Sequence, residues 1–319
     1  MFWKNIGENV MRTEIIELLD NLQTCEPVSY KNLTVYPLIN KDKSKVTYVS
    51  PEGLLKSSLI EITEIDKGGS VPELLLKNHS DYKVFFWDGI ELVGAKQNRV
   101  LNVSILINKQ AEVIIPVSCV EQSRWSYKSK NFMMSDYSMP NRMRMNKQRS
   151  VEFAMRAGIG ARSDQRQVWD DVANYSMAAN VESPTNAMND VLGRFKSELD
   201  DYSENLKPIA GQTGMIVEVN GRIIGLEYLS KEKVFKELYD RMLKSYAADC
   251  IVNNSHYNKK IAGFEGNPKE YLNNLRDVQS EEFKAVGLGS DIRFTNRNIN
   301  GSAIVYRKNL ISLSVSTIV

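Results

Sequence analysis

After one short amphipathic helix at 13–22, the first 120 residues consist of short apolar runs of the length of β-strands. Turn residues such as Gly68-Gly69 and Asp88-Gly89 separate several of these runs. Short strands at this spacing are typical of an antiparallel sandwich or a barrel-like sheet. The predicted strands are 33–38, 45–49, 59–65, 73–77, 83–87, 100–107 and 111–120.

Beyond about residue 145, apolar residues recur every three or four positions, which indicates helices. A tight type I′ hairpin interrupts them, because Asn220-Gly221 stands between two apolar runs. Helices are predicted to start near Ser163, Ser183, Ser230 and Asn267, and strand-like runs at 291–295, 303–306 and 310–315 close the chain.

The sequence therefore predicts an α+β protein. A β-rich antiparallel part over 1–135 would pack with a helical part containing hairpins over 140–319, and the two could form one integrated domain. The lack of sustained strand–helix alternation argues against a doubly wound nucleotide fold. The polar stretch 126–149 is the predicted linker. Its basic residues are expected to lie in a solvated linker or helix start rather than in a nucleic-acid arm: Arg142, Arg144, Lys147 and Arg149.

The most informative feature is a predicted hairpin around a three-residue turn at 108–110. Odd-numbered residues on both of its strands are apolar, so both strands direct these positions to a core. The register places Arg99 opposite Cys119 and Gln97 opposite Glu121. At the open end of the hairpin the buried row thus becomes polar. Burying a polar side chain without a hydrogen-bond partner costs several kcal/mol.

The open end of this hairpin is the candidate site. Guanidinium groups bind phosphate or carboxylate, amides read the polar edge of a base, and an indole stacks on an aromatic ring. Gly94 would allow backbone to approach a ligand closely, or a bulge. A simple ion pair between Arg99 and Glu121 at the end of the sheet is the alternative. The candidate ligand-binding residues are Lys96, Gln97, Arg99, Gln122, Arg124 and Trp125, and Glu121 is the candidate catalytic residue.

Two runs in this region carry a resemblance to a known family. They are Glu91-Leu-Val-Gly-Ala-Lys-Gln-Asn-Arg99 and Val117-Ser-Cys-Val-Glu-Gln-Ser-Arg-Trp125. Weaker matches lie at Asp164-Gln165, Val168-Trp169, Ser183-Pro-Thr185, 214–225 and Gly287-Leu-Gly289. Over about residues 30 to 315 the chain resembles an uncharacterised bacterial domain family named for its association with ADP-ribosylglycohydrolases and rhodanese-phosphatases.

The resemblance implies a place in NAD or ADP-ribose metabolism, in the setting of prokaryotic conflict systems, and brings no established activity. It also leads us to expect a histidine in the last strand, where this chain has Leu310-Ile-Ser-Leu313. A mechanism that needs that histidine is therefore in doubt for this chain.

Composition restricts the other chemistries. Forty-one basic and 39 acidic residues give a net charge of +2, so nucleic acid is an unlikely main partner and no membrane partner is expected. Three widely spaced cysteines, the absence of an apolar run at 1–10 and the lack of any 20-residue apolar stretch indicate a cytoplasmic protein. With His79 and His256 as the only histidines, no metal or cofactor is expected, although Glu121 and Asp164 leave a carboxylate-bound ion open.

Three functions remain open at this stage. The leading hypothesis is a binder of a nucleotide-type anionic ligand related to NAD or ADP-ribose. The alternatives are a metal-independent hydrolase or glycohydrolase that uses Glu121, and a structural or partner-binding subunit with 126–149 as its docking segment. Cys119 as a nucleophile is less favoured than Cys119 as a small buried side chain. The sequence does not give the oligomeric state.

Overall fold

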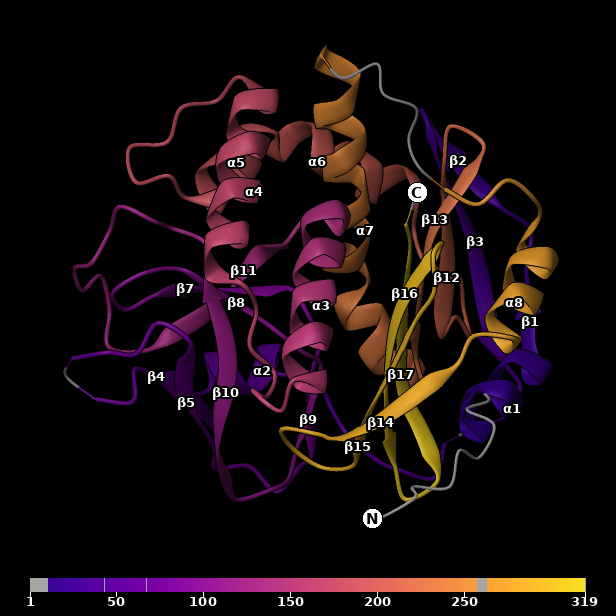
Figure 1. Cartoon of the computed structure of the whole chain (residues 1–319), viewed down its shortest axis with the longest axis horizontal. Coiled ribbons are helices and arrows are strands. Elements are labelled where there is room, and N and C mark those ends of the chain that lie inside the picture. Colours follow the sequence, from indigo (N-terminus) through magenta and orange to yellow (C-terminus); the bar gives the residue numbers. More distant parts are fainter. Residues whose placement is uncertain (1–10, 43, 67, 257–262, 319) are drawn as a thin grey trace, which may run out of the picture.

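Strands from both ends of the chain meet in one antiparallel sheet, on the right of Figure 1. The computed structural model describes residues 11–42, 44–66, 68–256 and 263–318, apart from the side chains of 253–256. Within them, nine strands belong to this sheet. In spatial order they are β1 (Leu22–Thr24), β3 (Leu33–Asn40), β12 (Gly214–Val219), β13 (Arg222–Leu229), β17 (Asn309–Thr317), β16 (Ile299–Tyr306), β15 (Ser290–Thr295) and β14 (Ser280–Lys284), with β2 (Val28–Tyr30) also paired to β3.

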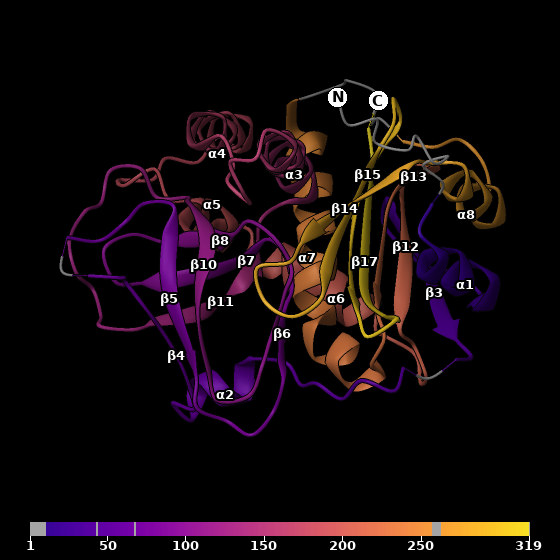
Figure 2. The same cartoon turned by 60° about the horizontal axis from the view of Figure 1, so that its bottom comes forward.

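A second antiparallel sheet is built from residues 60–138. It curls so that its edge strands, β4 (Ile60–Thr63) and β11 (Phe132–Ser138), approach each other, as predicted for a barrel-like sheet (Figure 2). A separate two-stranded pair, β6 (Val84–Phe86) with β9 (Ile105–Ile107), lies beside it. The spatial order is β11 (Phe132–Ser138), β7 (Ile90–Gly94), β8 (Arg99–Leu101), β10 (Ala111–Cys119), β5 (Glu73–Asn78) and β4 (Ile60–Thr63).

Most helices come from the middle of the chain, and the longest of them runs between the two sheets (Figure 1). The longest, α7 (Glu232–His256), contacts β11 of one sheet and β12 and β13 of the other. Two short helices, α1 (Thr13–Asn21) and α8 (Pro268–Arg276), bury apolar residues against the nine-stranded sheet. The remaining helices are α2 (Glu52–Lys56), α3 (Asn141–Arg156), α4 (Gln165–Ala179), α5 (Met188–Arg194) and α6 (Lys196–Asn205).

The α+β class is confirmed, and the distribution of its elements corrects the predicted halves. Strands lie towards both ends of the chain and helices in its centre, because the last 40 residues complete a sheet begun by β1 and β3. Residues 45–49 form no strand and pair only through the Val49–Val84 bridge.

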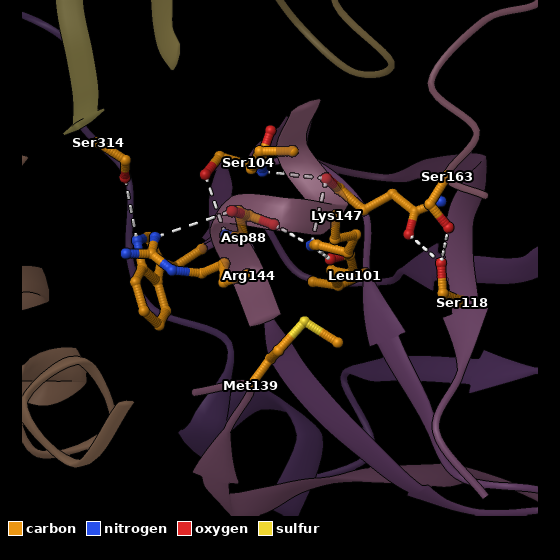
Figure 3. Close-up of polar contacts among 12 residues, drawn as sticks. Asp88, Leu101, Ser104, Ser118, Met139, Arg144, Lys147, Ser163 and Ser314 are labelled. Atoms are coloured by element: carbon orange, nitrogen blue, oxygen red, sulfur yellow. Dashed lines mark hydrogen bonds and ion pairs between the residues drawn. The ribbon is translucent and has the colours of Figure 1, made fainter. Parts of the chain in front are cut away.

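The predicted linker 126–149 is wrong, because most of it forms β11 and helix α3. Arg144 and Lys147 of α3 are buried and lie on either side of Asp88 in Figure 3. Arg144 also pairs with Glu227 of β13, so α3 joins the two sheets through charges. Only Arg142 and Arg149 of the basic run are exposed, as expected. The helix was missed because five of its eight buried residues are polar or charged, so its buried face shows no apolar period.

The predicted hairpin register is correct where its strands meet, but the hairpin divides. Cys119 pairs with Arg99, and Val117 with Leu101, as the alternation predicted. Nearer the turn the two strands separate: β9 pairs with β6, and the first six residues of β10 pair with β5. The alternation of apolar and polar residues determines which face of the sheet a side chain lies on, but it does not determine which strand pairs with which.

Candidate functional site

The loop between β7 and β8 depends on Gly94. Gly94 has φ +128°, and a Cβ atom there would lie 2.5 Å from Ser129 Oγ and 2.9 Å from the carbonyl oxygen of Asn131. The close backbone approach expected at this glycine is therefore made by the chain's own following loop. This packing fixes the loop 95–98, which carries the candidate residues Lys96 and Gln97 towards the end of β10.

Glu121 is held by hydrogen bonds on both carboxylate oxygens. Oε1 accepts from Arg124 Nε at 2.8 Å and from Thr185 Oγ1 at 3.0 Å. Oε2 accepts from Arg124 Nη2 at 2.6 Å and from the Asn98 backbone N–H at 3.0 Å. Burial would raise the pKa of Glu121, but these donors outweigh it and lower the pKa, so the side chain is an ionised anchor.

Arg124 is committed to the same anchor. Besides Glu121, its guanidinium donates to four acceptors on the surrounding loops, so every N–H of the group has a partner inside the chain. These acceptors are the carbonyl oxygens of Gly94, Ala95 and Ser126 and the side-chain oxygen of Asn98.

Beside this anchor lies a group that we call the Trp125 face: Glu64, Lys96, Arg99, Trp125 and Tyr127. The Lys96 ammonium lies 5.2 Å from the Trp125 ring centre and 5.3 Å from that of Tyr127, and donates to the carbonyl of Gly68 at 2.6 Å. The Arg99 guanidinium carbon lies 5.6 Å from the Trp125 ring centre. Both rings are exposed, Trp125 by 48%, so two cations flank an accessible aromatic surface.

Arg99 is 0% exposed, yet much of its guanidinium is unused. Nη1 donates to Gln97 Oε1 at 2.6 Å, whereas Nε and Nη2 have no hydrogen-bond partner among the described residues. Burial lowers the pKa of Arg99, although nearby Cys119 and Glu64 oppose that shift. A buried donor without an acceptor is costly, and a bound water or a ligand can supply the missing acceptor.

Glu64 is the residue of this face that the sequence analysis missed. It is 8% exposed, and neither of its oxygens has a hydrogen-bond partner within the ranges that the structure describes. The sequence contains a pattern that could have identified it. Ile60 and Ile62 are buried on one face of the strand, and the charged Glu64 is the next residue on that face. The same argument led to Arg99 on the neighbouring hairpin.

The remaining candidates connect the face to the strand ends. Gln97 donates to the carbonyl oxygen of Glu121 at 2.9 Å, which replaces the predicted ladder pair. Its side-chain oxygen accepts from Cys119 Sγ at 3.1 Å. Burial raises the pKa of Cys119 despite the nearby Arg99, so the thiol stays protonated at neutral pH. The side chain of Gln122 is exposed.

On the other side of Glu121 lies an open pocket of about 610 Å³, which we call the Thr185 pocket. This volume is in the usual range for small-molecule sites. Its lining includes three carboxylates, Glu121, Asp136 and Asp190, and one lysine, Lys128. The charge of the pocket therefore suits hydroxyl groups better than phosphates.

Thr185 reaches Glu121 because the predicted helix start at Ser183 is wrong. Ser183 Oγ accepts from the backbone N–H of Ala187 at 2.8 Å, and Asn186 has φ +51°, which a helix does not allow. Residues 183–186 form a turn instead, and helix α5 begins at Met188.

No group of three or more metal-ligating side chains occurs in the described part of the chain. Asp164, the other carboxylate considered for an ion, accepts from the backbone N–H groups of Arg166 and Gln167 and caps α4. None of the described helices is both long and apolar enough to cross a membrane. Residues 1–10 and the side chain of His256 lie outside the described residues.

Comparison with known proteins identifies a family. The profile of the ARG and Rhodanese-Phosphatase-superfamily-associated Protein domain, ARPP-1, matches residues 21–316. This span contains all strands of both sheets, apart from Thr317 at the end of β17, together with the Trp125 face and the Thr185 pocket. No curated protein and no solved structure matches the chain.

Proposed function

The chain belongs to the ARPP-1 family, and we propose that it binds a nucleotide-type anionic ligand, related to NAD or ADP-ribose, at the Trp125 face. The observation that carries the proposal is the buried guanidinium of Arg99, with two unpartnered nitrogens, beneath the half-exposed ring of Trp125. The association in the family's name motivates ADP-ribose and NAD as the first ligands to test. The proposed setting is cytoplasmic, in a prokaryotic conflict system.

Four side chains of the face have a role in this proposal. A base would stack on Trp125 and Tyr127, Lys96 would attract the phosphates by its charge, and Arg99 would donate to an acceptor of the ligand. Arg124 and Gln97 position the loops, since their donors are bound within the chain. Gln122 lies exposed beside Glu121, where a ligand could reach it.

The two alternative functions have weaker support. Glu121 accepts four hydrogen bonds, which leaves little lone-pair capacity for a proton in hydrolysis. A docking role for 126–149 fits poorly with a segment whose strand and helix are largely built into the core.

Mass spectrometry of small molecules released by denaturing the freshly purified protein tests the proposal. We expect a nucleotide related to NAD or ADP-ribose, in amounts close to one per chain, that is lost from an Arg99→Met variant. A Thr185→Val variant is the matched control, because it changes the neighbouring pocket and should retain the nucleotide. A nucleotide retained equally by the Arg99→Met variant would place the site elsewhere.

A further inference from the structure

Glu64 and Arg99 are two opposite charges, buried side by side in the Trp125 face, that do not close on each other. The carboxylate of Glu64 acts electrostatically on Arg99. Even so, both oxygens of Glu64 and two nitrogens of Arg99 lack hydrogen-bond partners in the described chain. The two carboxylate oxygens of Glu64 and the two guanidinium nitrogens of Arg99 can therefore hydrogen-bond a ligand.

Two other buried pairs in this protein close on each other. Glu121 and Arg124 approach to 2.6 Å, and Asp291 and Arg293 to 2.7 Å, each with hydrogen bonds on both carboxylate oxygens. The Asp88–Arg144 pair is open as well, at 3.8 Å, but Asp88 pairs with Lys147 and Arg144 with Glu227. Leaving a buried charge unpaired costs several kcal/mol, and the fold avoids that cost at these pairs. The open arrangement at Glu64 and Arg99 therefore requires an explanation of its own.

The position of the pair relative to the indole indicates what could lie there. A Cβ atom on Gly69 would lie 3.3 Å from Glu64 Oε2 and 3.4 Å from Cζ2 of Trp125, so the carboxylate and the indole border the same point. Gly69 has φ +76° and no side chain, so its backbone passes next to the space between Glu64 and Trp125 and leaves that space open. Arg99 lies against the same ring.

We propose that Glu64 and Arg99 read the edge of a flat ring that carries a hydrogen-bond donor next to an acceptor, while the ring stacks on Trp125. The N–H group of the ligand would donate to Glu64, and the adjacent acceptor would accept from Arg99. To admit the ligand, the Trp125 side chain turns away from Arg99. The ligand ring then replaces the indole in contact with the guanidinium. This inference rests on the proposed function and assigns the part of the nucleotide that is recognised.

Two parts of an NAD-type molecule present such an edge, namely the amino-pyrimidine edge of adenine and the carboxamide of nicotinamide. Calorimetric titrations with matched ligand pairs distinguish them. The first pair is AMP and purine riboside 5′-monophosphate, which lacks the amino donor. The second is nicotinamide mononucleotide and nicotinic acid mononucleotide, in which a carboxylate replaces the carboxamide.

We expect the complete edge to bind about 10- to 100-fold more tightly than its matched analogue in one of the two pairs. The pair that shows the preference identifies the base. In a Glu64→Met variant the preference should disappear, and binding of purine riboside 5′-monophosphate should stay within about threefold, because only the acceptor for the amino donor has been removed. Glu64→Gln, which keeps one acceptor, should show an intermediate preference.

The outcomes separate this inference from the proposed function. Nucleotides that bind to the wild type without preference in either pair would overturn the edge-reading role and leave the proposed function standing. If no nucleotide of either pair binds, the proposed function fails and the inference fails with it. The wild-type titrations decide between these outcomes even if a variant at Glu64 does not fold.

Discussion

The guanidinium of Arg99 lies 5.6 Å from the ring centre of Trp125, with the arginine fully buried and the tryptophan half-exposed. An exposed indole thus covers a cation whose donors are only partly used. Arg144, by contrast, lies 4.4 Å from the ring centre of Trp87 and has Glu227 as its charge partner. The relationship between Arg99 and Trp125 is the basis of the proposed ligand site.

Substitution of Trp125 should affect binding far more than stability. In Trp125→Leu the stacking surface is lost, and we expect the affinity for ADP-ribose to fall by about 1–3 kcal/mol, since this is the usual contribution of one stacked base. The free energy of unfolding should change by less than about 1 kcal/mol, because the ring is 48% exposed. Calorimetry and urea denaturation measure the two quantities. Tyr82→Leu, at an exposed aromatic outside the site, is the control and should alter neither.

Glu121 should prove to be an anchor of the fold. Glu121→Gln leaves the buried Arg124 without its charge partner, and we expect the free energy of unfolding to fall by about 3 kcal/mol in urea denaturation. The exposed pair Lys77–Glu112 provides the control, because Glu112→Gln should cost less than about 1 kcal/mol. Equal, small losses in both variants would show that the Glu121 pair has no anchoring role.

The buried carboxyl of Glu91 should make stability depend on pH. Burial raises the pKa of Glu91 to about 7, with hydrogen bonds such as that from Asn189 opposing the shift. A carboxyl whose pKa is higher in the folded state stabilises the fold at low pH. That contribution is present below the unfolded pKa and is lost as pH rises through about 7.

The corresponding measurement compares wild type with Glu91→Gln, which stays neutral at every pH. Between about pH 4.5 and 7.5 the wild type should lose about 3 kcal/mol relative to the variant, since one pKa unit is worth about 1.4 kcal/mol. Urea denaturation at several pH values gives this difference. Parallel stability curves for the two proteins would show that the pKa of Glu91 is not raised.

The charged contacts of helix α3 should be necessary for the two sheets to pack. Asp88→Asn removes the carboxylate that Lys147 and Arg144 share, and burial already lowers the pKa of Lys147 to about 8 despite Asp88. We expect a loss of about 3–5 kcal/mol in the free energy of unfolding, as for other buried pairs with one partner removed. Arg149→Ala, on the exposed side of the same helix, should change it by less than about 0.5 kcal/mol. A loss at Asp88 no larger than at Arg149 would contradict this account.

Local chemistry made several elements predictable. Asn220 and Gly221 both have positive φ, as the type I′ turn between β12 and β13 requires. Asn267 and Glu270 form the capping box that opens α8. In both cases the deciding interactions lie within a few residues along the chain, so the sequence contains them.

Other features depend on partners that no local pattern specifies. Strand β3 pairs with β12, about 180 residues later, and β10 exchanges β8 for β5 along its length. The candidate site was located because a charge continued an apolar row at Arg99. The matching signal at Glu64 lies on a distant strand, and only the fold brings the two together.

The most direct test of the central claim is a calorimetric titration of ADP-ribose into wild type and Arg99→Met. The account predicts binding by the wild type and a loss of at least about tenfold in affinity in the variant. It also predicts that the variant is no less stable than the wild type, because the substitution removes a buried and partly unpaired cation. Unchanged affinity in a variant that folds normally would contradict the proposed site.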